Sequence, residues 1–259
     1  MSANEHPRTP DWRFLVRPAW LFSGARDSVL DLLSSRSQTE FAHLYRTVRP
    51  YTMSGHVRLR ALYRAVRHVI ASGVPGALVE CGTARGGSAA LMGLTAQYLE
   101  ADRTVWVFDT FEGIPPPTTA DPDWQIAQQY TGSFRASVSE VKALLNQLGI
   151  IQRYKMIKGL LQETLPTCGV EAIALLHLDC DWYESVRCCL EHLYDRVSPG
   201  GIIQIDDYGH WQGAKKAVDE FLRDRQLDVR LRWLDYTGRQ LIKPGEVSGR
   251  PYLSRFTLP

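Results

Sequence analysis

Short apolar runs alternate with segments of helical periodicity along most of the chain from residue 76 onward. Strands that alternate with helices are joined by right-handed crossovers, and they form a mostly parallel sheet with helices on both faces. The last two runs flank a Thr-Gly turn and predict a hairpin that adds an antiparallel edge. The expected strands are 76–81, 104–109, 153–159, 172–179, 202–207, 229–235 and 239–243. We therefore expect an α/β protein with a mostly parallel seven-stranded sheet.

The segments between these strands have the features of helices. The helix expected at 137–150 begins with a serine and has a glutamate just inside it, which is typical of a capping box. The sequence SPGG at 198–201 predicts a turn before the fifth strand. The other expected helices are 55–73, 86–102, 183–197 and 213–225, preceded by helical pieces at 28–35 and 39–48.

The composition excludes several classes of protein. The 259 residues are 44% hydrophobic and 22% charged, as in a globular protein with one large α/β domain or two small ones. A formal net charge of +2 and scattered arginines argue against nucleic acid or a membrane surface as a partner. Five cysteines without a CxxC pair predict neither a disulfide framework nor a zinc site. With no signal-peptide pattern and no run of about 20 apolar residues, we expect a cytoplasmic protein.

Acidic residues stand at the ends of several expected strands. The carboxyl ends of parallel strands meet at one edge of the sheet, which is where ligands of such sheets bind. Buried carboxylates are costly unless they are paired or bound to a metal. This edge is therefore the predicted functional site, and its acids are Glu80, Asp109, Asp179, Asp206 and Asp207.

The first of these strands continues into a glycine-rich turn and a helix start, VECGTARGGS at 79–88. The spacing is not the GxGxxG of dinucleotide sites, and no P-loop lysine is present. Asp109, at the end of the next strand, is placed to accept hydrogen bonds from the two hydroxyls of a ribose, although it would also serve as a cap for the following loop. Glu80 at the mouth of the turn favours a cofactor with an ammonium or sulfonium group, such as S-adenosylmethionine, over the pyrophosphate of NAD.

The remaining acids form a cluster of hard oxygen ligands. Left alone, Asp179, Asp206 and Asp207 would repel one another, and a divalent cation, Mg²⁺ or Mn²⁺, would relieve this. Such an ion orients a substrate hydroxyl and lowers its pKa, and Asp179 is our expected general base. Alternatively, these acids are helix N-caps. His210 and Trp211 follow the cluster as candidate acceptor contacts, with loop hydrogen bonding and packing as their alternatives.

Several runs resemble the macrocin O-methyltransferase family, bacterial enzymes that methylate sugar hydroxyls on antibiotics and other glycosides. The resemblance extends from about residue 50 to residue 243. The runs are YTM (51–53), VECGTARGGS (79–88), FDTFEGIP (108–115), LDCDWYES (178–185) and IDDYGHWQGAKKAVDEF (205–221).

The resemblance implies the Rossmann-like class I methyltransferase fold, with S-adenosylmethionine and Mg²⁺ as cofactors. The metal ligands would be Asp179, Asp206 and Asp207. It also implies a small-molecule glycosylated acceptor, a homo-oligomer, a helical extension or lid at 1–60, a methyltransferase domain at 61–245 and a tail at 246–259. The implied cofactor contacts are Thr52, Met53, Glu80, Gly82, Thr83, Ser88, Asp109, Thr110, Ser137 and Asp181.

This sequence departs from the family pattern at Cys180, where glycine is most frequent, and at Thr110, where serine is common. The alternatives to a sugar O-methyltransferase are a catechol or phenol O-methyltransferase, a nicotinamide-dependent oxidoreductase, and a non-catalytic nucleoside-binding or scaffold protein. The long proline-rich loop at 114–124 is a candidate lid.

Overall fold

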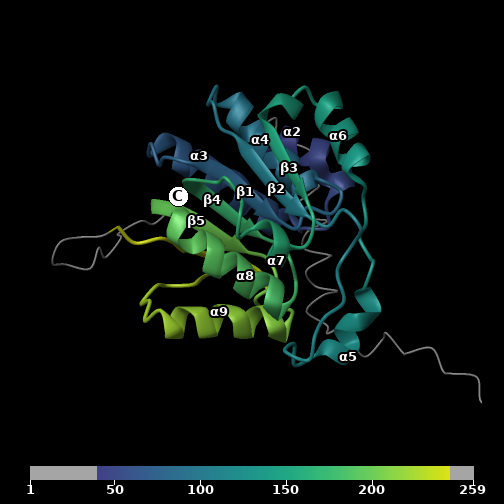
Figure 1. Ribbon diagram of the computed structural model, residues 1–259. Helices are drawn as coiled ribbons and strands as arrows, with labels where there is room; N and C mark the ends of the chain where they lie inside the picture. The colour runs from purple at the N-terminus through teal and green to yellow at the C-terminus, as the bar shows by residue number, and fades with distance from the viewer. Residues whose placement is uncertain (1–39, 246–259) are drawn as a thin grey trace, which may run out of the picture.

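The expected alternation of strands and helices is present in the computed structural model, which describes residues 40–245 (Figure 1). The sheet has seven strands in the order β3-β2-β1-β4-β5-β7-β6. The first five strands along the chain are parallel, β7 runs antiparallel to β5, and β6 pairs antiparallel with β7. The strands are β1 (Ala77–Cys81), β2 (Val105–Asp109), β3 (Tyr154–Lys158), β4 (Ile173–Leu178), β5 (Val197–Ile205), β6 (Arg232–Trp233) and β7 (Arg239–Ile242).

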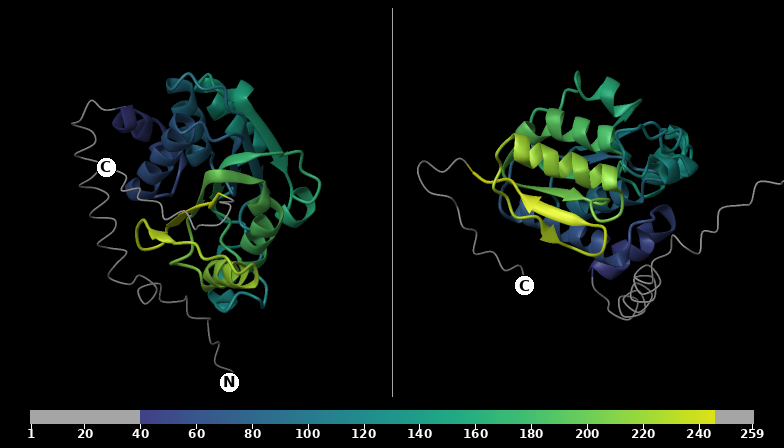
Figure 2. Two further views of the ribbon diagram at one scale, coloured as in Figure 1. Left: turned by 90° about the vertical axis from the view of Figure 1, so that its left-hand side faces the viewer. Right: turned by 90° about the horizontal axis from the view of Figure 1, so that it is seen from below.

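Helices cover both faces of this sheet, as Figure 2 shows from two further directions. One face carries α2 (Glu40–Val48), α3 (His56–Ala71), α4 (Gly87–Tyr98) and α6 (Val138–Gln147). The other carries α7 (Leu161–Thr164), α8 (Tyr183–Leu193) and α9 (Gln212–Asp224). The short helix α5 (Trp124–Ala127) lies in the connection after β2.

The two hydrophobic cores follow from the alternation of side chains along each strand. Leu78 of β1 packs in the core beneath α3 and α4, whereas its neighbour Val79 packs in the core beneath α8 and α9. Because both faces are covered, successive residues are apolar instead of alternating with polar ones. The fold class predicted from the sequence is confirmed.

The order of strands places a functional edge between β1 and β4. The chain builds outward from β1 to β2 and β3, and then returns to add β4 and β5 on the other side. The connections therefore diverge at the carboxyl ends of β1 and β4 and leave room for a ligand there.

Two details differ from the sequence-based expectations. The SPGG segment is part of β5, where the register with β4 shifts, so the predicted turn is a bulge inside a longer strand. The edge strand β6 has only two residues. The expected domain boundary at residue 60 falls within α3, and the expected helical piece at 28–35 and the tail at 246–259 lie outside the described residues.

Within residues 40–245, no helix combines the length and the apolar character needed to cross a membrane.

Candidate active site

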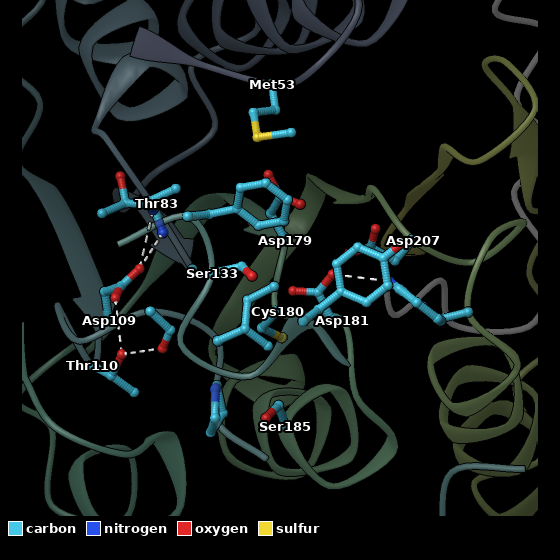
Figure 3. Close-up of a pocket in the computed structure, with 18 of the residues that line it drawn as sticks. Met53, Thr83, Asp109, Thr110, Ser133, Asp179, Cys180, Asp181, Ser185 and Asp207 are labelled. Atoms are coloured by element: carbon cyan, nitrogen blue, oxygen red, sulfur yellow. Dashed lines mark hydrogen bonds between the residues drawn. The ribbon is translucent and has the colours of Figure 1, made fainter. Parts of the chain in front are cut away.

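A cavity of about 650 Å³ opens at the carboxyl ends of β1, β2, β4 and β5 (Figure 3). It extends from the glycine-rich turn after β1 to the loops that follow β4 and β5. Three of the predicted site residues do not line it: Glu80, Ser137 and Asp206. The predicted residues that line it are Thr52, Met53, Gly82, Thr83, Ser88, Asp109, Thr110, Asp179, Asp181, Asp207, His210 and Trp211.

The turn after β1 comes very close to the end of β4. Gly82 has a φ of +83°, and a Cβ at this position would lie 1.9 Å from the backbone oxygen of Asp179. Only glycine allows both this dihedral angle and this approach. The turn therefore joins the two strand ends across which the cavity lies.

Asp109 holds the glycine-rich turn in the present structure. Its Oδ2 accepts hydrogen bonds from the amides of Thr83 (2.6 Å) and Ala84 (3.2 Å), and its Oδ1 accepts one from the amide of Phe111 (2.6 Å). Burial raises the pKa of Asp109, and these amides oppose the rise. The capping role considered from the sequence is thus present, and the carboxylate also faces the cavity.

Ser137 lies away from this cavity. It begins α6 in a capping box with Glu140, as the sequence predicts. It lines a separate depression together with Phe111, Val138 and Lys158. Its local role is therefore to cap a helix.

A cluster of carboxylates occupies the other end of the cavity. Burial raises the pKa of Asp179 well above its ordinary value, and the charges of Asp206 and Asp207 add to the rise. Burial and Asp179 raise the pKa of Asp181 to about 8, although the indole of Trp211 opposes this. The pKa of Asp207 is raised in the same way, by burial first and then by Asp181 and Asp206. Such mutual repulsion is what a bound cation would remove.

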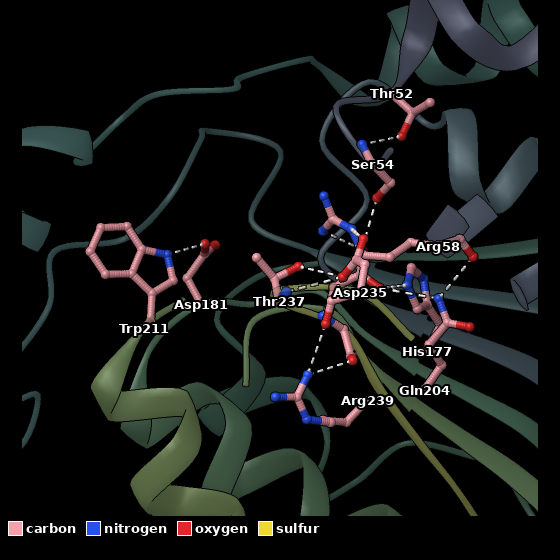
Figure 4. Close-up of polar contacts among 12 residues, drawn as sticks. Thr52, Ser54, Arg58, His177, Asp181, Gln204, Trp211, Asp235, Thr237 and Arg239 are labelled. Atoms are coloured by element: carbon pink, nitrogen blue, oxygen red, sulfur yellow. Dashed lines mark hydrogen bonds and ion pairs between the residues drawn. The ribbon is translucent and has the colours of Figure 1, made fainter. Parts of the chain in front are cut away.

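Asp206 differs from its neighbours because it is fully buried and surrounded by donors of the chain itself. These donors belong to Ser54, Arg58, His177 and Gln204, which lie close together in Figure 4. Its Oδ2 accepts hydrogen bonds from Ser54 Oγ (2.8 Å) and Arg58 Nη1 (2.9 Å). Its Oδ1 faces His177 Nε2 (3.0 Å) and Gln204 Nε2 (3.1 Å). Burial disfavours the charged form, but Arg58 and His177 outweigh it and hold the pKa of Asp206 well below its usual range.

A row of polar side chains crosses the sheet beneath α3. The register aligns Glu80, His177, Gln204 and Gln240 on β1, β4, β5 and β7. His177 Nδ1 lies 2.9 Å from Glu80 Oε1, and Gln240 Nε2 donates to Gln204 Oε1 at 3.4 Å. Burial opposes a charge on His177, but the Asp206 carboxylate raises its pKa well above the ordinary value. The row links the turn after β1 to the acids after β5.

One ligand atom each from His177, Asp179 and Asp206 lies within 4.8 Å of the others, the geometry of a possible metal site. This set includes His177 of β4, which the acid cluster predicted from the sequence does not contain.

Trp211 forms an aromatic wall of the cavity. Its Nε1 donates a hydrogen bond to Asp181 Oδ1 at 3.0 Å. The rings of Tyr130, Trp182 and His210 meet it edge to face. The indole therefore packs and also orients an acid.

A family model described as Macrocin-O-methyltransferase (TylF) matches residues 41–242. The chain belongs to the macrocin O-methyltransferase family. The match includes every element of the sheet, so the resemblance seen in the sequence motifs holds for the whole described fold.

The chain is similar in sequence to two proteins named as O-methyltransferases. It is 38% identical over 176 residues to demethyldecarbamoylnovobiocin O-methyltransferase of Streptomyces niveus, covering 66% of this chain and 67% of that protein. It is 35% identical over 182 residues to mycinamicin III 3''-O-methyltransferase of Micromonospora griseorubida, covering 68% and 71%.

Solved structures show the same fold. The O-methyltransferase NovP superposes with a TM-score of 0.72 at 32% identity, covering 75% of this chain and 83% of that one. The calicheamicin methyltransferase CalS11 gives a TM-score of 0.63 at 23% identity, covering 92% and 99%.

Sequence reasoning missed four residues that contact the acid cluster of this candidate site. Ser54 and Arg58 reach the acid cluster from the N-terminal side, and His177 and Gln204 reach it from within strands. A usable signal was present, because His177 and Gln204 each precede a strand-end aspartate by two positions. Residues two apart on a strand share a face. The positions of Ser54 and Arg58 carried no such signal.

Proposed function

We propose that this O-methyltransferase transfers a methyl group from S-adenosylmethionine to a sugar hydroxyl of a small-molecule glycoside, assisted by Mg²⁺. The observation that carries the proposal is one continuous cavity with two ends. One end has a glycine-rich turn and Asp109, and the other has an acid cluster next to an aromatic wall.

Three buried oxygen atoms support the fit of a cofactor and a metal ion. Glu80 Oε2, Thr83 Oγ1 and Asp207 Oδ2 have no hydrogen-bond partner within residues 40–245. Buried polar atoms without partners are rare because they are costly. Thr83, which lines the cavity, would bind the amino-acid end of S-adenosylmethionine. Glu80 adjoins the glycine-rich turn without lining the cavity, and it would reach the ammonium group through its Oε2 atom. Asp207 would bind the cation.

Ribose and adenine would lie at the end of the cavity that has the glycine-rich turn and Asp109. Asp109 and Thr110 would contact the ribose hydroxyls, since both line the cavity after β2. Thr52 and Met53 would cover the cofactor from the N-terminal side, where the exposed Met53 stands over the cavity (Figure 3). Gly82 and Ser88 would allow the cofactor to approach the backbone closely.

The proposed metal ligands are Asp179, Asp206 and Asp207. They differ in whether their carboxylates are free to contact an ion in the cavity. Asp179 and Asp207 line the cavity. Asp206 would become a ligand only if one of its four donors moved away, and Arg58 is the donor on a side chain long enough to do so. When bound, Mg²⁺ would orient the acceptor hydroxyl and lower its pKa.

Asp179 is the proposed general base. It lies at the end of β4, between the glycine-rich turn and the acids after β5. Burial and the charges of Asp206 and Asp207 raise its pKa, which makes it a stronger proton acceptor than an ordinary carboxylate. The hydroxyl proton would pass to Asp179 as the acceptor oxygen attacks the methyl group. Trp211 would face the apolar side of a sugar ring, and His210 lies beside it.

The first test is calorimetry with S-adenosylhomocysteine and then Mg²⁺, on the wild type and Asp207→Asn. We expect both ligands to bind the wild type, and Mg²⁺ to bind the variant at least about 10-fold more weakly. A wild type that binds neither ligand would overturn the proposal.

A second candidate keeps the chemistry and changes the acceptor to a catechol or phenol, because an aromatic wall also suits an aromatic ring. Methyl transfer to deoxysugar glycosides but not to dihydroxybenzenes would support the sugar acceptor, and the reverse would support the second candidate. Homo-oligomer formation and a cytoplasmic location remain predictions.

A further inference from the structure

The side chain that joins the two ends of the site is His177, which lies outside the cavity. It is 1% exposed, on β4, two residues before Asp179. Its Nδ1 lies 2.9 Å from Glu80 Oε1, and its Nε2 lies 3.0 Å from Asp206 Oδ1. Both neighbours are carboxylates, so a ring that donates to both carries a proton on each nitrogen.

The two carboxylates belong to different parts of the proposed function, on which this inference rests. Glu80 adjoins the glycine-rich turn, and its second oxygen has no partner within residues 40–245. Asp206 stands at the end of β5 among the proposed metal ligands. Ser54, Arg58 and Gln204 also hold Asp206, whereas His177 is the one described hydrogen-bond partner of the Glu80 carboxylate.

We propose that His177 is a positioning residue that orients Glu80 toward the cofactor with one ring nitrogen and Asp206 toward the metal site with the other. The two functions are separable, because each depends on a different atom of the ring. If His177 only filled space, substituting it would change the affinities for the cofactor and for Mg²⁺ alike.

Two substitutions separate the two nitrogens. The amide nitrogen of asparagine lies near the place of Nδ1, so His177→Asn keeps a donor to Glu80 and removes the one to Asp206. The amide nitrogen of glutamine lies near the place of Nε2, so His177→Gln keeps the donor to Asp206 and removes the one to Glu80. Both variants lose the ring charge equally, so a difference between their ligand affinities reports the loss of one hydrogen bond or the other.

The experiment is calorimetric titration of the full chain with S-adenosylhomocysteine, followed by Mg²⁺. For His177→Asn we expect Mg²⁺ affinity to fall about 10- to 100-fold more than cofactor affinity. For His177→Gln we expect the opposite order, with cofactor affinity falling roughly 10-fold or more, as for a lost hydrogen bond to a charged group. Thr95→Val is the control, since it removes an equally buried hydrogen bond to Leu91 in α4, away from the site.

Equal losses of both affinities in both variants, or no loss in either, would overturn the role of His177. If the wild type binds neither ligand, the proposed function fails instead, so the two failures are distinguishable. Should a variant fail to fold, ¹⁵N spectra of wild-type histidine side chains serve in its place. We expect S-adenosylhomocysteine to shift Nδ1 of the buried ring and Mg²⁺ to shift Nε2, and shifts of both nitrogens by either ligand would contradict the inference.

Discussion

Individual residues in this site carry charges that the fold has to balance. Asp206 is fully buried, and its negative charge is matched by Arg58, whose side chain is 18% exposed. Breaking a buried ion pair leaves the remaining charge without compensation, which costs more than the intact pair contributes. Arg58 also pairs with Asp235, so it links the N-terminal side of α3 to the turn before β7.

We expect Arg58→Met to lower the free energy of unfolding by about 3–5 kcal/mol, as for other broken buried pairs. Urea denaturation measures this loss. Arg187→Met is the matched control, since Arg187 pairs with Glu191 and Asp224 at the surface, and its loss should cost at most about 1 kcal/mol. An equal loss of free energy of unfolding in the two variants would contradict the inference that Arg58 compensates the buried charge of Asp206.

At the scale of the elements, local sequence signals decide where strands and helices end, and the site uses those ends. The turn after β1 needs Gly82 because the end of β4 lies against it. The start of α6 needs Ser137 because its hydroxyl accepts a hydrogen bond from the amide of Glu140. The first feature lies in the cavity and the second does not, so substitutions should separate them.

We expect Gly82→Ala to destabilise the protein by at least about 1–3 kcal/mol, because the new Cβ would overlap Asp179 backbone, and to weaken binding of S-adenosylhomocysteine. Gly149→Ala is the control. Gly149 also has a positive φ (+68°), but nothing lies within 4 Å of its missing Cβ. Thermal unfolding and calorimetry give both quantities, and identical behaviour of the two variants would refute the close-approach argument.

We expect Ser137→Ala to cost about 1 kcal/mol of stability through loss of the helix cap and to leave cofactor affinity unchanged. Calorimetry with S-adenosylhomocysteine is the decisive measurement. A clear loss of affinity would instead support the cofactor contact that the sequence resemblance implied for Ser137.

At the scale of the whole molecule, the long loop at 114–124 packs against α8 and α9 on one face of the sheet. Trp182 Nε1 donates to the backbone oxygen of Pro115 at 2.6 Å, and Asp121 Oδ1 accepts from the amide of Tyr183 at 2.7 Å. Asp121 is 1% exposed and lies close against Gly213 of α9. These contacts hold the loop against α8 and α9.

We therefore expect limited proteolysis to spare this loop even without cofactor, and Asp121→Ala to expose it to cleavage. Mass spectrometry of the fragments, with and without S-adenosylhomocysteine, would locate the cuts. Cleavage within the loop of the free wild type, prevented by the ligand, would support the lid considered from the sequence.

The sequence by itself determined the fold class, the order of elements and the edge of the sheet that forms the site. These features depend on periodicity, glycine turns and acids at strand ends, which are local along the chain. Only the tertiary structure decided that Asp206 is enclosed by Ser54 and Arg58, and that His177 lies between two acids. Those contacts join residues up to 152 positions apart, and their partners depend on how strands and helices pack, which no local pattern specifies.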